Sequence, residues 1–233
     1  MNTSADPEAR EFTKQAGNAE EADQLRREAR VLAAASHPGV VQLRSFDGRT
    51  LRQVLVPGRP LSDLAPSPAD AARVALSIAT TLADLHECGV THGALSAEHI
   101  LVPPSCDAVL CSFGRGDATG GRPPPEEARA ADVVALAVTL FATGALPDPL
   151  ARVLAPIAAG GRRTPSARRV ANRLGDALAG FEAPPHAATR RRSPVPQPCG
   201  VAEDRRAAAQ FPIAGSRPGS VEVPVGGRPP FWR

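Results

Sequence analysis

The sequence has no tyrosine, one tryptophan and one lysine, and aromatic residues make up only 3% of its 233 residues. It also lacks a long apolar run, because the longest, residues 133–146, is shorter than the roughly 18–20 residues that span a bilayer. Residues 1–13 are polar, unlike the apolar segment of a signal peptide. We therefore expect neither a transmembrane segment nor a secretory leader.

The four cysteines show no metal-ligand spacing, so the sequence predicts no metal site. Reduced thiols in a cytoplasmic protein are the simplest interpretation of these cysteines. Cytoplasmic is accordingly the localisation that we predict.

The net charge of +3 is unevenly distributed, since residues 183–233 carry eight basic and three acidic side chains. The basic character thus belongs to the end of the chain and does not indicate a nucleic-acid-binding domain or partner. Proline and arginine dominate residues 183–233 without apolar periodicity, which predicts a disordered tail. The arginine run at 190–192 could contact an acidic surface, although a solvated linker is the simpler interpretation.

Apolar residues make up 42% of the chain, which suffices for one globular core. Hydrophobic periodicity and turn residues predict an α+β protein with both helices and short strands. The predicted helices cover residues 19–36, 69–87, 130–143, 148–158 and 165–180. The predicted strands cover residues 40–43, 51–56, 99–102 and 108–111. Asn18 and Glu21 form a capping-box pattern that marks the start of the first helix.

A series of local motifs occurs in a fixed order along residues 11–180. They lie at residues 12–14, 25–41, 54–61, 85–92, 110–114, 125–129, 132–136 and 163–167. Together these motifs resemble the bacterial serine/threonine protein kinase family of the actinobacterial type. The resemblance implies a two-lobe fold, with a reduced, strand-bearing N-lobe at 11–57, a mainly helical C-lobe at 58–180 and the tail at 183–233.

The resemblance also implies where a nucleotide would bind. Lys14, the only lysine, stands at the position of the family's ATP-binding lysine, and Glu28 stands at that of its helical partner. Backbone groups around Leu55 and Val56 would face an adenine ring. The resemblance further implies an ion pair between Glu126 and Arg163.

The groups that perform phosphoryl transfer in the family are replaced in this chain. Ala94 stands in place of the catalytic aspartate, Ser96 in place of the lysine that neutralises the γ-phosphate, and His99 in place of the metal-binding asparagine. Ser112 replaces the aspartate that chelates magnesium. Mg²⁺ prefers carboxylate ligands, so we expect no bound magnesium and no required cofactor, with ATP as the only candidate ligand. Glu98 does not substitute as a ligand, because an extended segment would turn it away from His99.

The glycine-rich loop that covers the phosphates is also missing, because only 13 residues precede Lys14 and none is glycine. The small lobe is either truncated or begins upstream of residue 1. The sequence therefore favours a pseudokinase that acts as a regulatory or scaffold module, with protein partners such as an active kinase or its substrate. One alternative is a weakly active serine/threonine kinase with substituted catalytic groups, and another is a decayed or wrongly started reading frame.

Overall fold

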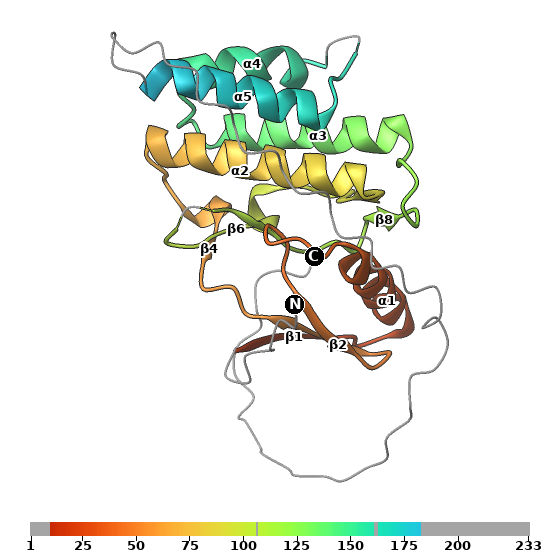
Figure 1. The fold of residues 1–233 in the computed structure, drawn as a ribbon. Helices are drawn as coiled ribbons and strands as arrows, with labels where there is room; N and C mark the ends of the chain where they lie inside the picture. The colour runs from red at the N-terminus through yellow and green to blue at the C-terminus, as the bar shows by residue number, and fades with distance from the viewer. Residues whose placement is uncertain (1–9, 106, 161–162, 183–233) are drawn as a thin grey trace, which may run out of the picture. The chain divides into compact units, whose positions relative to one another are not determined.

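A computed structural model describes residues 10–105, 107–160 and 163–182, and the predicted disordered tail at 183–233 lies outside these residues. Within the described ranges the chain is a mixed α/β protein with five α-helices and small antiparallel sheets (Figure 1). This agrees with the α+β class that the sequence predicts.

The first sheet has three antiparallel strands in the order β1-β3-β2, formed by β1 (Glu11–Gln15), β2 (Leu43–Phe46) and β3 (Thr50–Val54). Helix α1 (Ala19–Ala34) contacts β2 and β3. The Asn18 side chain accepts the Glu21 N–H at 2.9 Å and Glu21 Oε2 accepts the Gly17 N–H at 2.7 Å, which confirms the predicted cap. The cap fixes where α1 starts, directly after β1.

The four other helices pack together on the other side of the short strands (Figure 1). They are α2 (Pro68–Glu87), α3 (Glu126–Ala142), α4 (Asp148–Ala158) and α5 (Ala167–Glu182). Contacts join α2 to α3 and α5, and α4 to α3 and α5. Their shared core is aliphatic, as the scarcity of aromatic residues requires, with Phe113 as a fully buried aromatic side chain.

Short strands connect the first sheet to the helices. One sheet has the order β4-β6-β7, and a second pairs β5 with β8. Their bounds are β4 (Arg59–Pro60), β5 (Val90–Thr91), β6 (Ile100–Val102), β7 (Val109–Leu110) and β8 (Asp117–Ala118). Two 3₁₀ turns, η1 (Leu61–Asp63) and η2 (Ala97–His99), flank β4 and β6.

Several element boundaries differ from the prediction. The strand expected at 40–43 begins only at Leu43, because Val40 instead makes an isolated parallel bridge to Leu110. The strand expected at 99–102 begins at Ile100, because His99 ends the turn η2. Helix α3 begins four residues earlier than predicted, at Glu126, where Pro125 and two acidic residues favour a helix start.

Two expectations about membranes and thiols can be compared with the structure. In the ranges that the structure describes, no helix has the length and apolarity needed to cross a bilayer. Cys111 is a free thiol, as the sequence predicts for this residue.

Candidate functional site

The site is built around a buried ion pair. Lys14 Nζ donates to Glu28 Oε1 at 2.7 Å, with 7% of the lysine and 3% of the glutamate side chain exposed. Lys14 comes from β1 and Glu28 from α1, so the pair joins the sheet to the helix packed against it. The structure thus brings together the two residues that the sequence singles out as nucleotide contacts.

A third residue that sequence reasoning missed completes this pair. Gln53 of β3 donates from Nε2 to the same Glu28 Oε1 at 3.2 Å and is itself 2% exposed. Gln53 lies two positions after the buried Leu51, so both side chains are on the same face of β3. An apolar residue is expected on that face, and the sequence therefore does not indicate that Gln53 is buried beside Glu28. The amide instead satisfies a carboxylate that is cut off from water.

Ser112 lies on the far side of Lys14. Its Oγ accepts a hydrogen bond from Lys14 Nζ at 3.4 Å, and its backbone has φ of +66°, the only positive φ at a non-glycine residue in the described ranges. The left-handed conformation is unfavourable for a residue with a Cβ. Next to it, burial raises the pKa of the Cys111 thiol above its ordinary value.

A buried carboxylate holds the loop that contains Ala94. Asp132 of α3 is 1% exposed and accepts the backbone N–H groups of His92 and Gly93, both at 2.9 Å. The His86 ring of α2 also donates to it from Nε2, at 3.0 Å. Three donors from two segments thus converge on one side chain and fix the loop to the helical core.

His92 is neutral in this environment. Its Nε2 donates to the Cys111 carbonyl at 3.0 Å, and its Nδ1 accepts the Ala94 N–H at 3.3 Å, which together define the tautomer. Burial lowers the pKa of His92 to about 4, against a smaller raising effect from Asp132. The ring also packs on Phe113, with centroids 4.5 Å apart, so His92 links two loops as a structural group.

The side chains at Ala94, Ser96, His99 and Ser112 include no carboxylate, and His99 supplies an imidazole. Ala94 has no acceptor beyond its backbone, and its carbonyl accepts the His99 Nδ1–H at 2.7 Å. Ser96 precedes η2 without a side-chain capping bond. In the described part of the chain no group of three His, Cys, Asp or Glu side chains could hold a metal ion. Glu98 lies within η2 and not in an extended segment, so the reason given for excluding it is wrong.

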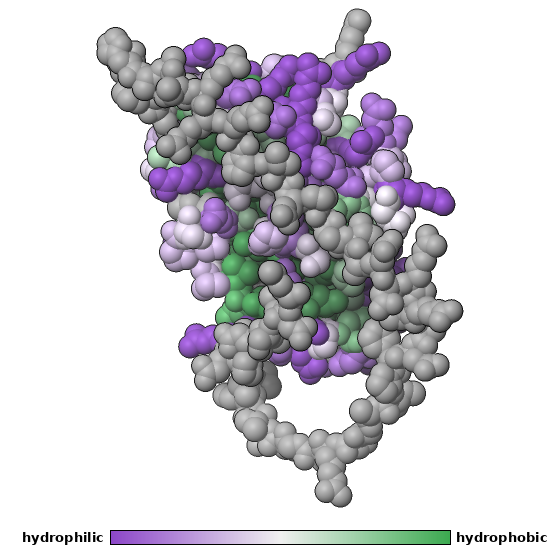
Figure 2. Space-filling view, viewed as in Figure 1, coloured by the Kyte–Doolittle hydropathy of each residue, from purple (hydrophilic) through white to green (hydrophobic). Residues whose placement is uncertain are grey.

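Leu55 and Val56 lie between β3 and β4, and one of their backbone donors is already used. The Leu55 N–H donates to the Arg10 carbonyl at 2.7 Å, and the Val56 carbonyl accepts the Gly58 N–H at 2.9 Å. Two of the four backbone polar groups of Leu55 and Val56 are therefore already engaged within the chain. On the face drawn in Figure 2, apolar side chains reach the surface between the first sheet and the helices, where this segment runs.

The expected pair between Glu126 and Arg163 does not form. Both side chains are exposed, and among the ion pairs of the described residues none joins them. Helix α5 is tied to α2 by Arg168 instead, which donates from Nε to Glu87 Oε1 at 2.8 Å and also contacts Asp84. Exposed partners gain little from an ion pair, whereas Arg168 makes several charge-assisted bonds at once.

Two close backbone contacts were not foreseen from the sequence. A Cβ at Gly93 would lie 2.1 Å from the Arg115 carbonyl oxygen, and one at Gly116 would lie 2.4 Å from the Thr91 carbonyl oxygen. The segment that follows Ser112 therefore packs directly on the loop at 91–93. The glycines in the sequence are the only signal for this contact.

Two grooves of the described surface, of about 690 and 520 Å³, lie apart from this site, since neither is lined by Lys14, Glu28, Leu55 or Val56. A comparison of the chain with protein-family models finds no match, and a comparison with curated proteins finds none either.

Proposed function

We propose that this chain adopts a reduced protein-kinase-like, two-lobe fold and works as a pseudokinase, a regulatory or scaffold module without phosphoryl-transfer activity. The observation that carries the proposal is the set of contacts around Lys14. A buried lysine on a strand pairs with a glutamate on the adjacent helix, as in an active kinase, but its next neighbour is the hydroxyl of Ser112. The pair that orients a nucleotide is kept while the metal ligand is lost.

The loop geometry supports the same proposal. Asp132 fixes the backbone of His92 and Gly93, so the loop that carries the catalytic base in kinases is rigidly held although Ala94 supplies no base. A proton acceptor must lie within hydrogen-bond reach of the hydroxyl that attacks the phosphate. A loop that is rigidly held but has no proton acceptor at Ala94 favours ligand binding over catalytic turnover.

A nucleotide, if held, would be held without magnesium. Lys14 would contact the phosphates, and the Leu55 carbonyl and Val56 N–H would contact the adenine. The carboxylate that accepts the proton, the lysine that neutralises the γ-phosphate and the two metal ligands of the kinase family are replaced here by Ala94, Ser96, His99 and Ser112. Metal-independent ATP binding in the cytoplasm, coupled to a protein partner such as an active kinase, is the function that these residues fit best.

Thermal unfolding of the full chain with ATP or ADP, with and without Mg²⁺, tests this function. A nucleotide present at 100 times its Kd adds about 2.7 kcal/mol of stability, a shift of several degrees. We expect a shift that is independent of metal and that is lost in Lys14→Met, with Arg49→Met on the exposed turn before β3 as the control. The readout is the ligand-induced shift, so a lower melting temperature of the variant itself does not obscure it.

The two other results have distinct meanings. A shift that requires Mg²⁺ would contradict the assignment of Ser112 and His99 as non-ligands and would favour the weakly active kinase. If no nucleotide changes the melting temperature, the chain does not bind nucleotides. The proposed function would then be that of a scaffold that works through protein contacts alone.

A further inference from the structure

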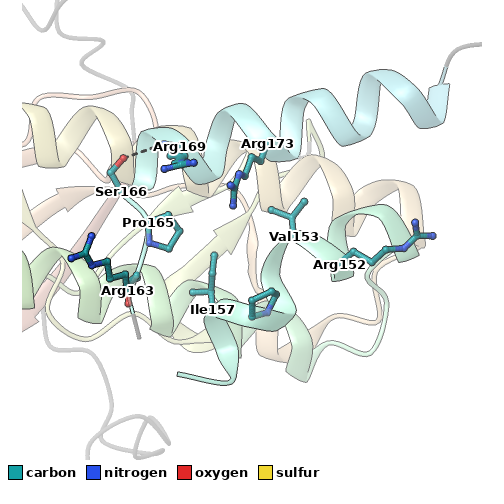
Figure 3. Close-up of a pocket in the computed structure, with 10 residues that line it drawn as sticks. Arg152, Val153, Ile157, Arg163, Pro165, Ser166, Arg169 and Arg173 are labelled. Atoms are coloured by element: carbon teal, nitrogen blue, oxygen red, sulfur yellow. Dashed lines mark hydrogen bonds between the residues drawn. The ribbon is translucent and has the colours of Figure 1, made fainter. Parts of the chain in front are cut away.

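The groove of about 690 Å³ lies between α4 and α5, and arginines surround it (Figure 3). Arg152 comes from α4, Arg163 from the segment before α5, and Arg169 and Arg173 from α5 itself. In Figure 3 Arg163 and Arg152 lie at opposite ends of the groove, and Arg173 extends from α5 toward its middle. The groove thus has positive charge along its length.

None of these arginines forms an ion pair with a carboxylate of the described residues. No aspartate or glutamate lines the groove, and in the described ranges the ion pairs of arginine involve Arg26, Arg73 and Arg168 only. All four groove arginines are exposed. Four like charges around one groove repel each other unless an anionic group lies among them.

The floor of the groove is aliphatic. Ile157 is buried, and Val153 and Pro165 are half-buried beside it. No aromatic ring lines the groove, so it offers no platform for the stacking of nucleic-acid bases. The combination of an aliphatic floor and a cationic wall fits a chain that carries both apolar and acidic side chains.

The spacing of the arginines suggests the conformation of that chain. Arg169 and Arg173 are four residues apart on a helix, which places their Cβ atoms about 5–6 Å apart. In an extended peptide, side chains two residues apart lie on one side at roughly 6.6 Å, and those between them point the opposite way. Acidic residues at alternate positions would therefore meet α5, while aliphatic residues between them would meet Val153 and Ile157 of α4.

We propose that this groove binds an extended segment of a partner protein in which acidic and aliphatic side chains alternate. The chain's own tail is a poor occupant, because residues 183–233 carry eight basic and three acidic side chains. The proposal concerns a surface separate from Lys14 and does not depend on nucleotide binding or on the assigned fold family.

Fluorescence anisotropy with the full chain tests the proposal. The probe is a fluorescein-labelled peptide, Gly-Glu-Val-Glu-Val-Glu-Gly, and the comparison peptides replace each glutamate by glutamine or group the glutamates and valines in separate blocks. We expect saturable binding of the alternating peptide and weaker binding of both comparison peptides. Arg169→Ala/Arg173→Ala should weaken binding about tenfold, since each exposed charge pair contributes modestly.

A charge-matched variant separates the groove from general attraction. Arg27 and Arg30 are exposed on α1, and Arg27→Ala/Arg30→Ala removes the same charge far from the groove. We expect this variant to bind the alternating peptide like the unmodified chain. Equal weakening in both double variants, or equal affinity for the glutamine peptide, would overturn the proposal.

Other occupants would give other results, each of which overturns the proposal. Tighter binding of a ten-nucleotide oligothymidylate than of the peptide, lost in Arg169→Ala/Arg173→Ala, would assign the groove to nucleic acid. Binding to phosphatidylserine vesicles in place of the peptide would assign it to a membrane surface. Self-association of the full chain that the same variant abolishes would assign it to a second copy.

Discussion

Lys14 Nζ and Glu28 Oε1 lie 2.7 Å apart across the junction of β1 and α1, with both side chains almost fully buried. Charges removed from water are stable only when each satisfies the other, and here Gln53 adds a further hydrogen bond to the carboxylate. The pair is thus both a fixed structural link and the feature that supports the proposed nucleotide site.

Breaking this pair should be costly for stability. We predict that Lys14→Met lowers the free energy of unfolding by about 3–5 kcal/mol, because it leaves Glu28 buried without its counter-ion. The double variant Lys14→Met/Glu28→Leu should recover at least half of that loss. Urea denaturation of the single and double variants measures the coupling, and additive losses would show that the two charges do not depend on each other.

His92 should make stability depend on pH. Burial lowers its pKa to about 4 in the folded state, from 6.5 in an unfolded chain, so the unfolded state binds a proton more readily. The contribution of neutral His92 is complete above pH 6.5 and declines as the pH falls toward 4, by about 3 kcal/mol in all. His92→Gln should remove this part of the pH dependence.

Urea denaturation at several pH values between 4.5 and 7 measures that difference. Carboxylates that titrate in the same range affect both proteins alike and cancel in the comparison. Parallel pH profiles for the unmodified chain and His92→Gln would mean that His92 titrates normally despite its burial.

Gly93 should tolerate no side chain. A Cβ there would lie 2.1 Å from the Arg115 carbonyl oxygen, and φ is +75°. We predict that Gly93→Ala destabilises the protein by about 3 kcal/mol through the combined clash and left-handed backbone. Gly144→Ala is the control, because Gly144 has φ of +65° but no atom within 4 Å of its Cβ position, and it should lose about 1 kcal/mol.

Thermal or urea unfolding distinguishes the two glycine variants. Equal losses would show that the clash is relieved by a small movement of the segment at 115–116. In that case Gly93 would be a conformational requirement only, and not a packing contact.

Asp132 should act as an acceptor and not merely as a polar core residue. Asp132→Asn replaces one acceptor oxygen by an NH₂ group that faces backbone N–H donors, and we predict a loss of about 3 kcal/mol. Faster hydrogen exchange at the His92 and Gly93 amides should accompany it. Asp176→Asn, at an exposed position of α5, changes the charge equally and should leave both measurements unchanged.

Local patterns in the sequence predict the helices because their causes are local. The Asn18 and Glu21 cap and the period of apolar residues in α2 involve neighbours within a few positions, and α4 has the predicted bounds. Strand ends were less predictable, since Val40 leaves its expected strand to pair with Leu110, seventy residues away. Pairing with a distant partner leaves no local signature.

At the site, too, the sequence identifies some of the residues and misses others. The resemblance singles out Lys14 and Glu28, and the structure joins them. The resemblance gives no indication of the Gln53 contact with Glu28, of the His86 contact with Asp132, or of the packing of Arg115 on Gly93. One wrong expectation, a pair between Glu126 and Arg163, concerns two exposed side chains.

Transfer of the γ-phosphoryl group tests the absence of turnover most directly. The full chain would be incubated with γ-labelled ATP, with Mg²⁺ or Mn²⁺, and with a general acceptor protein, alongside an active kinase as a positive control. We predict no incorporation of label into the chain or the acceptor above that of a heat-denatured sample, at any nucleotide concentration. Label transfer that depends on metal and is lost in Lys14→Met would contradict the proposed function and would assign the chain to active kinases.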